Sequence, residues 1–410
     1  MNPTTISTDL LTPLGAYLRL RGAGRASFIL ESVERGRLGR NSWIGAGSRI
    51  VSFEEAEELA LPVVGYLAYD HVAKLEPTVP LPNTGRGFPE SRLVVAETLV
   101  RFDHGAGVAE VLAGDADEIA GRLEAEIPWH AEQRGVAGPL RRFPDQARYE
   151  EMVRAVKEHI VAGDVFQAVP SQRAERPTSA SPLDIYRALR RVNPSPYLFL
   201  LELDGIALVG SSPERLVACE DGRASLCPIA GTTDPTEGDV ERLLSSEKDK
   251  AEHIMLVDLG RNDLSRVCRA GTVHVARSME VERFSHVSHL VSEVVGELRD
   301  GVTPFDVLRA CFPAGTVSGA PKVRAMQLIS ELEGFRRGPY GGAVLYSLPG
   351  GTMDACIALR TIVMADGVAH LQAGAGIVAD SEPAAEHEEC LRKLAALEAA
   401  IDLAEKEFAS

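Results

Sequence analysis

Two pairs of acidic residues have the spacing of a divalent-cation site. Asp249 and Glu252 are three residues apart, and so are Glu386 and Glu389. In a helix this spacing puts both carboxylates of a pair on one face. Because Mg²⁺ usually takes one or two protein carboxylates together with water and substrate, two such helices facing each other would suit one ion. Either pair alone is more typical of a solvated acidic face.

A glycine-rich segment in the last third of the chain could hold an anion. It reads PAGTVSGAPK at residues 313–322. We predict Ser318 as the N-cap, and Pro321 in the first turn, of a helix that runs to about Glu333. Glycine lets a backbone N–H approach an anion closely, and the start of a helix favours negative charge. Ordinary turns are the alternative interpretation.

A second glycine-rich segment, QAGAGIVADS at residues 372–381, contains the dinucleotide fingerprint G-x-G-x-x-A at residues 374–379. That fingerprint requires a helix beginning inside it and an acidic residue about 20 positions later. Here Asp380 and Pro383 follow almost at once, so the next helix starts too late. The pattern therefore disfavours a dinucleotide-dependent oxidoreductase.

Two single residues could move protons. Glu214 follows an apolar run at residues 206–210 that is typical of a buried strand. A carboxyl group at such a strand end can have a raised pKa and act as a general acid. His289 could act as a base, although a lone histidine is more often a core or surface residue.

The elements that would position these residues are mixed helices and strands without a repeating βαβ unit. Residues 1–135 form an N-terminal region of short apolar runs, a polar linker covers residues 132–140, and residues 145–408 form a second region. We predict strands at residues 27–30, 93–102, 165–169, 198–203 and 206–210, and helices at residues 147–161, 182–192, 247–259 and 384–408. This pattern is typical of an α+β fold.

Composition narrows the class of protein further. The chain has 410 residues and a formal net charge of −16, which argues against a general nucleic-acid binder but allows a local pocket for an anion. No apolar run reaches the ~18–20 residues that span a bilayer, and no signal-peptide pattern is present. Six cysteines without a CxxC pair predict reduced thiols in a cytoplasmic protein.

Five segments of the chain are informative together. They are PIAGT (228–232), AEHIMLVDLGRND (251–263), PAGTVSGAPK (313–322), RGPYGGA (337–343) and QAGAGIVADS (372–381). Taken together and in this order, they resemble segments of chorismate-utilising enzymes. From about residue 11 to residue 400 the chain is similar to the large subunits of anthranilate synthases. The resemblance implies large antiparallel sheets packed as a sandwich, with helices outside and the site in a cleft.

The resemblance also implies roles for single residues. Glu252 and Glu389 match the direct Mg²⁺ ligands, and Asp249 and Glu386 match the acids that support them. Asp249 stands in place of a usual glutamate, so its carboxylate is shorter by about one C–C bond, ~1.5 Å. Glu214 matches the acid that protonates the departing C4 hydroxyl.

His289 matches the histidine associated with loss of pyruvate, and Thr316 belongs with the catalytic set. The residues that match the holders of the substrate and its two carboxylates are Thr316, Tyr340, Arg360, Gly374, Gly376 and Lys393, with Ala230, Gly231 and Thr232 beside them.

Two positions separate the reactions of these enzymes. Ala230 stands where aminodeoxychorismate synthases carry a nucleophilic lysine, and a methyl group cannot attack. Gln167 stands where isochorismate- and salicylate-forming enzymes carry a lysine that activates water. The resemblance therefore implies a Mg²⁺-dependent lyase of tryptophan biosynthesis that converts chorismate and ammonia to anthranilate and pyruvate. The ammonia would come from a separate glutamine amidotransferase subunit, because no G-x-C-x-G segment is present.

Two further segments resemble the halves of a tryptophan feedback pocket. The first contributes Glu31 and Ser32, and the second, NPSPYL, contributes Asn193, Pro194, Pro196, Tyr197 and Leu198. Leu198 replaces a usual methionine. The alternative interpretation is a plain strand and a proline-rich turn.

Two other functions stay open at this stage. One is a 2-amino-2-deoxyisochorismate synthase of secondary metabolism, which aminates chorismate but does not eliminate pyruvate. The other is a non-catalytic tryptophan-binding or scaffold relative, which Asp249 favours and the intact Glu214, Glu252, His289 and Glu389 disfavour.

Overall fold

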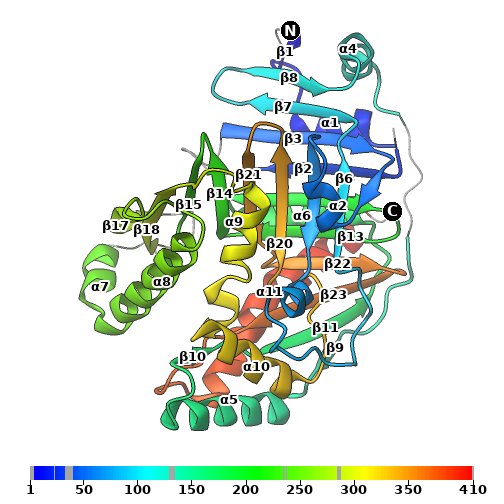
Figure 1. The fold of residues 1–410 in the computed structure, drawn as a ribbon. Coiled ribbons are helices and arrows are strands. Elements are labelled where there is room, and N and C mark those ends of the chain that lie inside the picture. Colours follow the sequence, from blue (N-terminus) through cyan, green and yellow to red (C-terminus); the bar gives the residue numbers. More distant parts are fainter. Residues whose placement is uncertain are drawn as a thin grey trace.

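The computed structural model describes residues 4–22, 24–32, 40–128, 134–233, 236, 238–283 and 288–408. Within these ranges the chain forms two large sheets, one of 11 strands and one of 10, and every strand pairing is antiparallel. Helices lie against the sheets (Figure 1). None of the helices in the described ranges is long and apolar enough to cross a membrane.

The 11-stranded sheet joins the two regions of the chain. Its strands, in spatial order, are β1 (Thr4–Ser7), β8 (Val108–Ala113), β7 (Thr98–Asp103), β3 (Asn41–Gly47), β2 (Ala26–Glu31), β12 (Tyr197–Leu203), β13 (Ala207–Ser212), β22 (Thr361–Ala365), β23 (Val368–Gly374), β11 (Ser171–Pro177) and β9 (Arg141–Phe143).

The 10-stranded sheet is also built from both regions. Its strands are β16 (Ile229–Thr233), β18 (Ser288–Glu297), β15 (Arg223–Leu226), β14 (Arg215–Glu220), β21 (Thr352–Ile357), β20 (Ala343–Leu348), β5 (Val63–Leu67), β6 (Ser91–Val95) and β4 (Ile50–Val51), with β17 (His274–Arg283) pairing β18. A short pair, β10 (Gln167–Ala168) and β19 (Gly319–Ala320), stands apart. The two regions, residues 1–135 and 145–408, therefore do not correspond to separate sheets. Their division stays a proposal about the function that each region carries.

The helices follow local sequence signals. They are α1 (Pro13–Leu20), α2 (Phe53–Glu57), α3 (Val72–Leu75), α4 (Ala116–Glu124), α5 (Gln146–Val161), α6 (Pro182–Val192), α7 (Asp239–Ser245), α8 (Glu247–Ser265), α9 (Pro304–Cys311), α10 (Lys322–Glu333) and α11 (Pro383–Glu407). For example, α6 begins with a capping box between Ser181 and Asp184 and has Pro182 in its first turn, which are favoured starts.

One buried core lies between the two sheets. Phe28, Phe199 and Leu201 of the 11-stranded sheet pack in one buried cluster with Tyr66 and Val344 of the 10-stranded sheet. Residues of α1, α4, α6 and α11 cover the other face of the first sheet, and residues of α2, α8 and α9 cover that of the second. The predicted α+β sandwich with helices outside is confirmed.

Three element predictions were wrong in detail. The run at residues 93–102 is interrupted after Val95, and its halves enter different sheets as β6 and β7. The N-cap of α10 is Pro321 rather than Ser318, whose hydroxyl instead donates to the carbonyl of Ala314 at 2.7 Å. The strand predicted at residues 165–169 is limited to β10, because this segment pairs with the short β19 and otherwise forms an isolated bridge between Ala168 and Ile377.

Candidate active site

One large cavity, of about 2850 Å³, is lined by residues of both sheets and of α8 and α11. It brings together side chains that lie far apart in the sequence. The candidate residues that line it are Glu214, Ala230, Gly231, Asp249, Glu252, His289, Thr316, Tyr340, Arg360, Gly374, Gly376, Glu386, Glu389 and Lys393. Thr232 belongs to β16, and its side chain lies outside the described part.

Glu214 has the environment of a general acid. It follows β13 at the point where the chain turns into β14. Burial raises the pKa of its carboxyl group from 4.5 to about 7, and neither the Thr316 hydroxyl nor the charge of Lys393 offsets this. The Thr316 hydroxyl donates to Glu214 Oε1 at 3.0 Å, so it orients the carboxyl group. A carboxyl with such a pKa can carry and release a proton near neutral pH.

The pKa of His289 is shifted in the opposite direction to that of Glu214. Burial lowers the pKa of its imidazole, and the nearby charge of Arg360 lowers it further. Nδ1 lies 2.9 Å from the carbonyl oxygen of Gly231, and since a carbonyl only accepts, Nδ1 carries the proton there. In the neutral ring Nε2 is then the atom able to accept a proton.

A cationic and glycine-rich part of the wall can receive carboxylates. Arg360 lines it with a backbone φ of 46°, a strained conformation that is often found at functional sites. The ammonium of Lys393 donates to the carbonyl of Gly374 at 2.8 Å. A Cβ at Gly374 would lie only 3.0 Å from the hydroxyl of buried Tyr340. Glycine is required at this close approach.

The two acidic pairs line the same cavity from two helices, α8 and α11. Within α8, Asp249 and Glu252 lie near the N-terminal end, and the backbone of Asp249 is capped by Ser246 at 3.2 Å. Glu252 accepts from the amide of Gln167 at 3.2 Å. In α11, Glu389 pairs with Lys393 at 2.8 Å.

These oxygen donors fit a hard divalent cation. Nevertheless, no three of the four acids bring ligand atoms within 4.8 Å of one another among the described residues. An ion held between them would therefore take its other ligands from water or substrate.

Comparisons with known proteins agree with this geometry. The sequence matches the chorismate binding enzyme family over residues 26–399. The chain belongs to the chorismate-binding enzyme family. Anthranilate synthase component 1 of Thermus thermophilus is 42% identical, covering 98% of this chain and 97% of that protein. The same component of Pseudomonas putida is also 42% identical, covering 97% and 94%.

Solved structures give the same picture. The crystal structure of anthranilate synthase component I from Streptococcus pneumoniae is similar with a TM-score of 0.80 and 32% identity, over 97% of this chain and 100% of that one. The menaquinone-specific isochorismate synthase of Escherichia coli has a TM-score of 0.77 at 22% identity, over 97% and 94%. At that identity the second likeness concerns the fold alone.

For a chorismate-binding enzyme, the side chains at two wall positions limit the possible nucleophiles. Gln167 is 4% exposed, and its amide oxygen has no hydrogen-bond partner among the described residues. Ala230 lies on β16, in the register irregularity where Gly231 takes a φ of 68°. Neither a methyl group nor an amide supplies a covalent nucleophile or a base.

The two predicted regulatory segments, at residues 31–32 and 193–198, line another part of the same cavity. Leu198 on β12 pairs with Glu31 on β2, and Glu31 is buried against Arg190, with the two side chains 3.2 Å apart. Ser32 Oγ and Asn193 Nδ2 are buried without a hydrogen-bond partner in the described ranges. Buried polar groups of this kind are usually satisfied, so a polar ligand would suit them.

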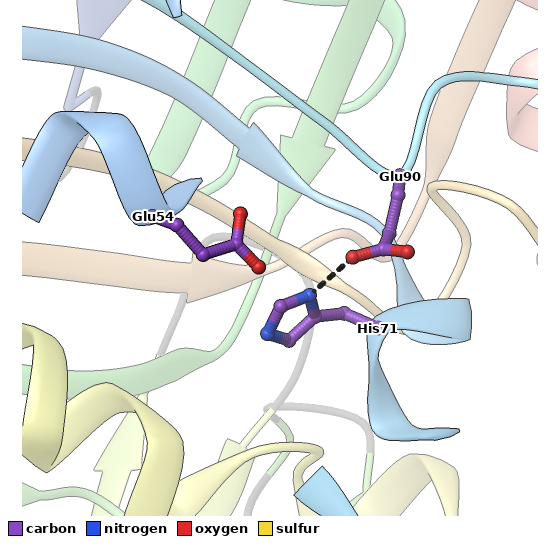
Figure 2. Close-up of side chains that lie close together, drawn as sticks. All are labelled: Glu54, His71 and Glu90. Atoms are coloured by element: carbon purple, nitrogen blue, oxygen red, sulfur yellow. Dashed lines mark hydrogen bonds and ion pairs between the residues drawn. The ribbon is translucent and has the colours of Figure 1, made fainter. Parts of the chain in front are cut away.

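A different cluster contains the one group of three ligand atoms within 4.8 Å among the described residues: Glu54, His71 and Glu90 (Figure 2). Its members come from α2, the turn before α3, and the segment before β6. The Lys74 ammonium lies 2.9 Å from Glu54 and 2.6 Å from Glu90, so these carboxylates already have a cation. We assign the cluster to structural ion pairing.

Arg337 is a buried residue beside the cavity wall that was not predicted from the sequence. It donates to the carbonyls of Val317 at 2.7 Å and Val169 at 2.6 Å, and it pairs with Glu333 at 2.6 Å. Its guanidinium also lies 5.5 Å from the centre of the Tyr340 ring. Arg337 thus fixes residues next to Thr316 and beside the glycine-rich wall. Its place in the segment RGPYGGA was the only available signal.

Proposed function

We propose that the chain is the aminating component of an anthranilate synthase, a lyase that converts chorismate and ammonia to anthranilate and pyruvate in tryptophan biosynthesis. The observation that carries the proposal is that Ala230 and Gln167 line the same cavity as Glu214 and His289. An acid and a base are present in that cavity, whereas the lysines expected for the related reactions are replaced. Ammonia from outside the chain is then the nucleophile.

Different residues of the chain bind different parts of the substrate. Arg360 and Lys393 provide charge-assisted donors for the two substrate carboxylates. Tyr340 and the close backbone at Gly374 and Gly376 shape the wall beside them. Holding chorismate in one pose places its reacting carbons against the acid and the base.

We assign two proton transfers to side chains that line the cavity. In the first step ammonia forms a bond to C2, the C4 hydroxyl leaves as water with a proton from Glu214, and the new ammonium group on C2 gives up a proton to become the amine. In the second step the C2 proton moves to Nε2 of His289, the bond to the enolpyruvyl oxygen breaks, and the ring becomes aromatic. The released enolpyruvate takes up a proton and becomes pyruvate. Thr316 keeps the carboxyl group of Glu214 oriented throughout.

Magnesium is the ion that this proposal requires. Glu252 and Glu389 would hold it directly, with Asp249 and Glu386 supporting them. When bound, Mg²⁺ supplies Lewis-acid polarisation of the substrate. Asp249 packs against Gly231, where a Cβ would come 3.2 Å from the Cβ of Asp249.

Two partners complete the proposal. A glutamine amidotransferase subunit supplies ammonia, and tryptophan binds at Glu31, Ser32, Asn193, Pro194, Pro196, Tyr197 and Leu198 as a feedback inhibitor. The unpartnered polar atoms of Ser32 and Asn193 support the tryptophan pocket. We place the enzyme in the cytoplasm, where its six free cysteines stay reduced.

Product analysis tests the reaction itself. The purified chain is incubated with chorismate, Mg²⁺ and ammonium, and the products are separated by chromatography. We expect fluorescent anthranilate and pyruvate in equal amounts. Isochorismate, salicylate or the para-amino isomer would contradict the proposal. Release of 2-amino-2-deoxyisochorismate without pyruvate would replace it with the aminating enzyme that stops early.

A further inference from the structure

Three side chains form a polar group between the predicted tryptophan segment and the acid: Tyr197, Arg215 and Asp354. Arg215 Nε donates to the hydroxyl of Tyr197 at 2.7 Å and lies 3.4 Å from Asp354 Oδ1. The Tyr197 hydroxyl in turn donates to Asp354 Oδ1 at 3.2 Å. The side chains of Arg215 and Asp354 are only 16% and 20% exposed.

This group touches both functional parts of the cavity. Arg215 is the residue after Glu214, and Tyr197 belongs to the segment at residues 193–198. Asp354 comes from β21, the neighbour of β14. All three side chains line the same cavity as Glu214 and Ser32. No residue of the group is among those assigned to the proton transfers.

Backbone pairing links the same two segments. Tyr197 pairs with Ser212 and Leu198 pairs with Ser211, at the end of the strand that leads to Glu214. The hydroxyl of Ser211 donates to the carbonyl of Asn193. Ser212 donates to the carbonyl of Ile357 at 2.6 Å, and the backbone of Ile357 donates to the carbonyl of Glu214 at 3.0 Å.

We propose that Arg215 is a positioning residue, held by Tyr197 and Asp354, that ties the turn carrying Glu214 to the segment at residues 193–198. A change in that segment on binding a ligand then moves the acid, which connects the feedback pocket to catalysis. The inference rests on the proposed role of Glu214 as the acid. It adds residues and a physical route that the proposed function does not require.

The physical reason is the sensitivity of proton transfer to position. A misplacement of about 1 Å can reduce a rate on the order of 10²-fold. Removing one member of a buried charged group leaves the others without a partner, so they rearrange. Loosening this turn also lets water reach Glu214, which removes the burial that keeps its carboxyl group protonated.

Two conservative variants test the proposal, Asp354→Asn and Tyr197→Phe. Chorismate consumption with ammonium is followed whatever the product, together with the melting temperature. We expect kcat to fall by about tenfold to 10²-fold, with the KM for chorismate unchanged. We also expect the alkaline limb of the kcat profile to move to lower pH, which a loss of stability alone would not cause.

The matched control is Arg309→Lys. The guanidinium of Arg309 is similarly half-buried against Glu57, but neither residue lines the cavity. This variant should keep the wild-type kcat and pH profile. Arg215→Lys, which keeps the charge but loses the planar fork, should lie between wild type and Asp354→Asn.

Tryptophan provides the last readout. In Asp354→Asn, tryptophan should still bind by calorimetry but inhibit less completely than in wild type. Wild-type kcat, pH profile and inhibition in both variants would overturn the proposal. Failure of the wild-type chain to make anthranilate would instead count against the proposed function, because the positioning test uses chorismate consumption alone.

Discussion

At the scale of single residues, the cavity holds two candidate groups whose pKa values are shifted in opposite directions by the same cause. Burial raises the pKa of Glu214 and lowers that of His289, because it disfavours the charged form of each. At neutral pH the carboxyl group can therefore still carry a proton and the imidazole can accept one. Pairs of groups shifted apart in this way are typical of acid and base partners.

The first prediction concerns the pH dependence set by Glu214. Since the acid must be protonated and its pKa is about 7, activity should be highest below this pH and fall as the pH rises through it. Glu214→Gln should lower turnover by about 10²–10⁴-fold and abolish that alkaline limb. The measurement is kcat/KM against pH for both proteins. An unchanged limb in the variant would show that another group produces it.

The second prediction concerns how far the reaction goes without its base. His289→Ala should slow pyruvate release more than chorismate consumption, because only the elimination step needs the C2 proton removed. The aminated intermediate should therefore accumulate and be visible by chromatography. Equal slowing of both processes would argue that His289 has a binding role instead.

At the scale of elements, local signals determined what the sequence could predict. The bounds of α6 agree with prediction, and α5 begins one residue before the predicted start, because caps and helical periodicity are encoded within each segment. The prediction of a single strand at residues 93–102 was wrong. The break between β6 and β7 depends on the distant strands with which each of them pairs. Ser318 does not cap the helix because its hydroxyl donates to the carbonyl of Ala314 instead.

The candidate site, too, could be predicted only where the signal is local in the sequence. Motifs identified the candidate residues that line the cavity, since each lies in a short recognisable segment. The groups that position them were not predictable, because their partners are remote in sequence. Arg337 bonds to Val169, 168 positions away, and Tyr197 bonds to Asp354, 157 positions away.

The third prediction concerns the two helices that carry the acids. Glu252→Gln and Glu389→Gln should each lower turnover by at least ~10²-fold, since Lewis-acid stabilisation is worth several kcal/mol, while the melting temperature stays the same. Glu247→Gln is the control, because this residue of α8 is 89% exposed and should keep full activity. Full turnover in excess EDTA would refute the magnesium site.

At the scale of the whole molecule, both sheets mix the two regions of the chain, so the N-terminal segment at Glu31 and Ser32 lines the same cavity as the candidate catalytic residues. A ligand bound at one end can thus affect the other through shared strands. Any part of this coupling that acts on binding is reciprocal in free energy. Chorismate should therefore weaken tryptophan binding as much as tryptophan weakens chorismate binding.

The fourth prediction concerns that pocket. Tryptophan should bind and inhibit, and Ser32→Ala should weaken its binding by roughly tenfold, the loss of one hydrogen bond to a charged group of ~1.5 kcal/mol. Ser27→Ala is the control, because Ser27 belongs to β2, the strand that ends just before Ser32, and does not line the cavity. Calorimetric titration gives both affinities. No heat of binding at millimolar tryptophan would end the assignment.

The fifth prediction concerns the source of nitrogen. Releasing ammonia from glutamine requires a thiolate nucleophile in an amidotransferase of the G-x-C-x-G kind. All six cysteines of this chain are free, and burial raises the pKa of each thiol. They are therefore thiols of low reactivity at neutral pH. The chain alone should use ammonium and not glutamine.

Adding the amidotransferase subunit should restore the use of glutamine. Iodoacetamide then separates the two activities, because it alkylates reactive thiolates. It should abolish glutamine-dependent synthesis by the complex while the rate with ammonium stays the same. Glutamine use by the purified chain, or equal loss of both rates, would contradict the division of labour between two subunits. If the ammonium rate survives, the thiols of this chain are structural, and the only nucleophile it handles is the ammonia delivered to it.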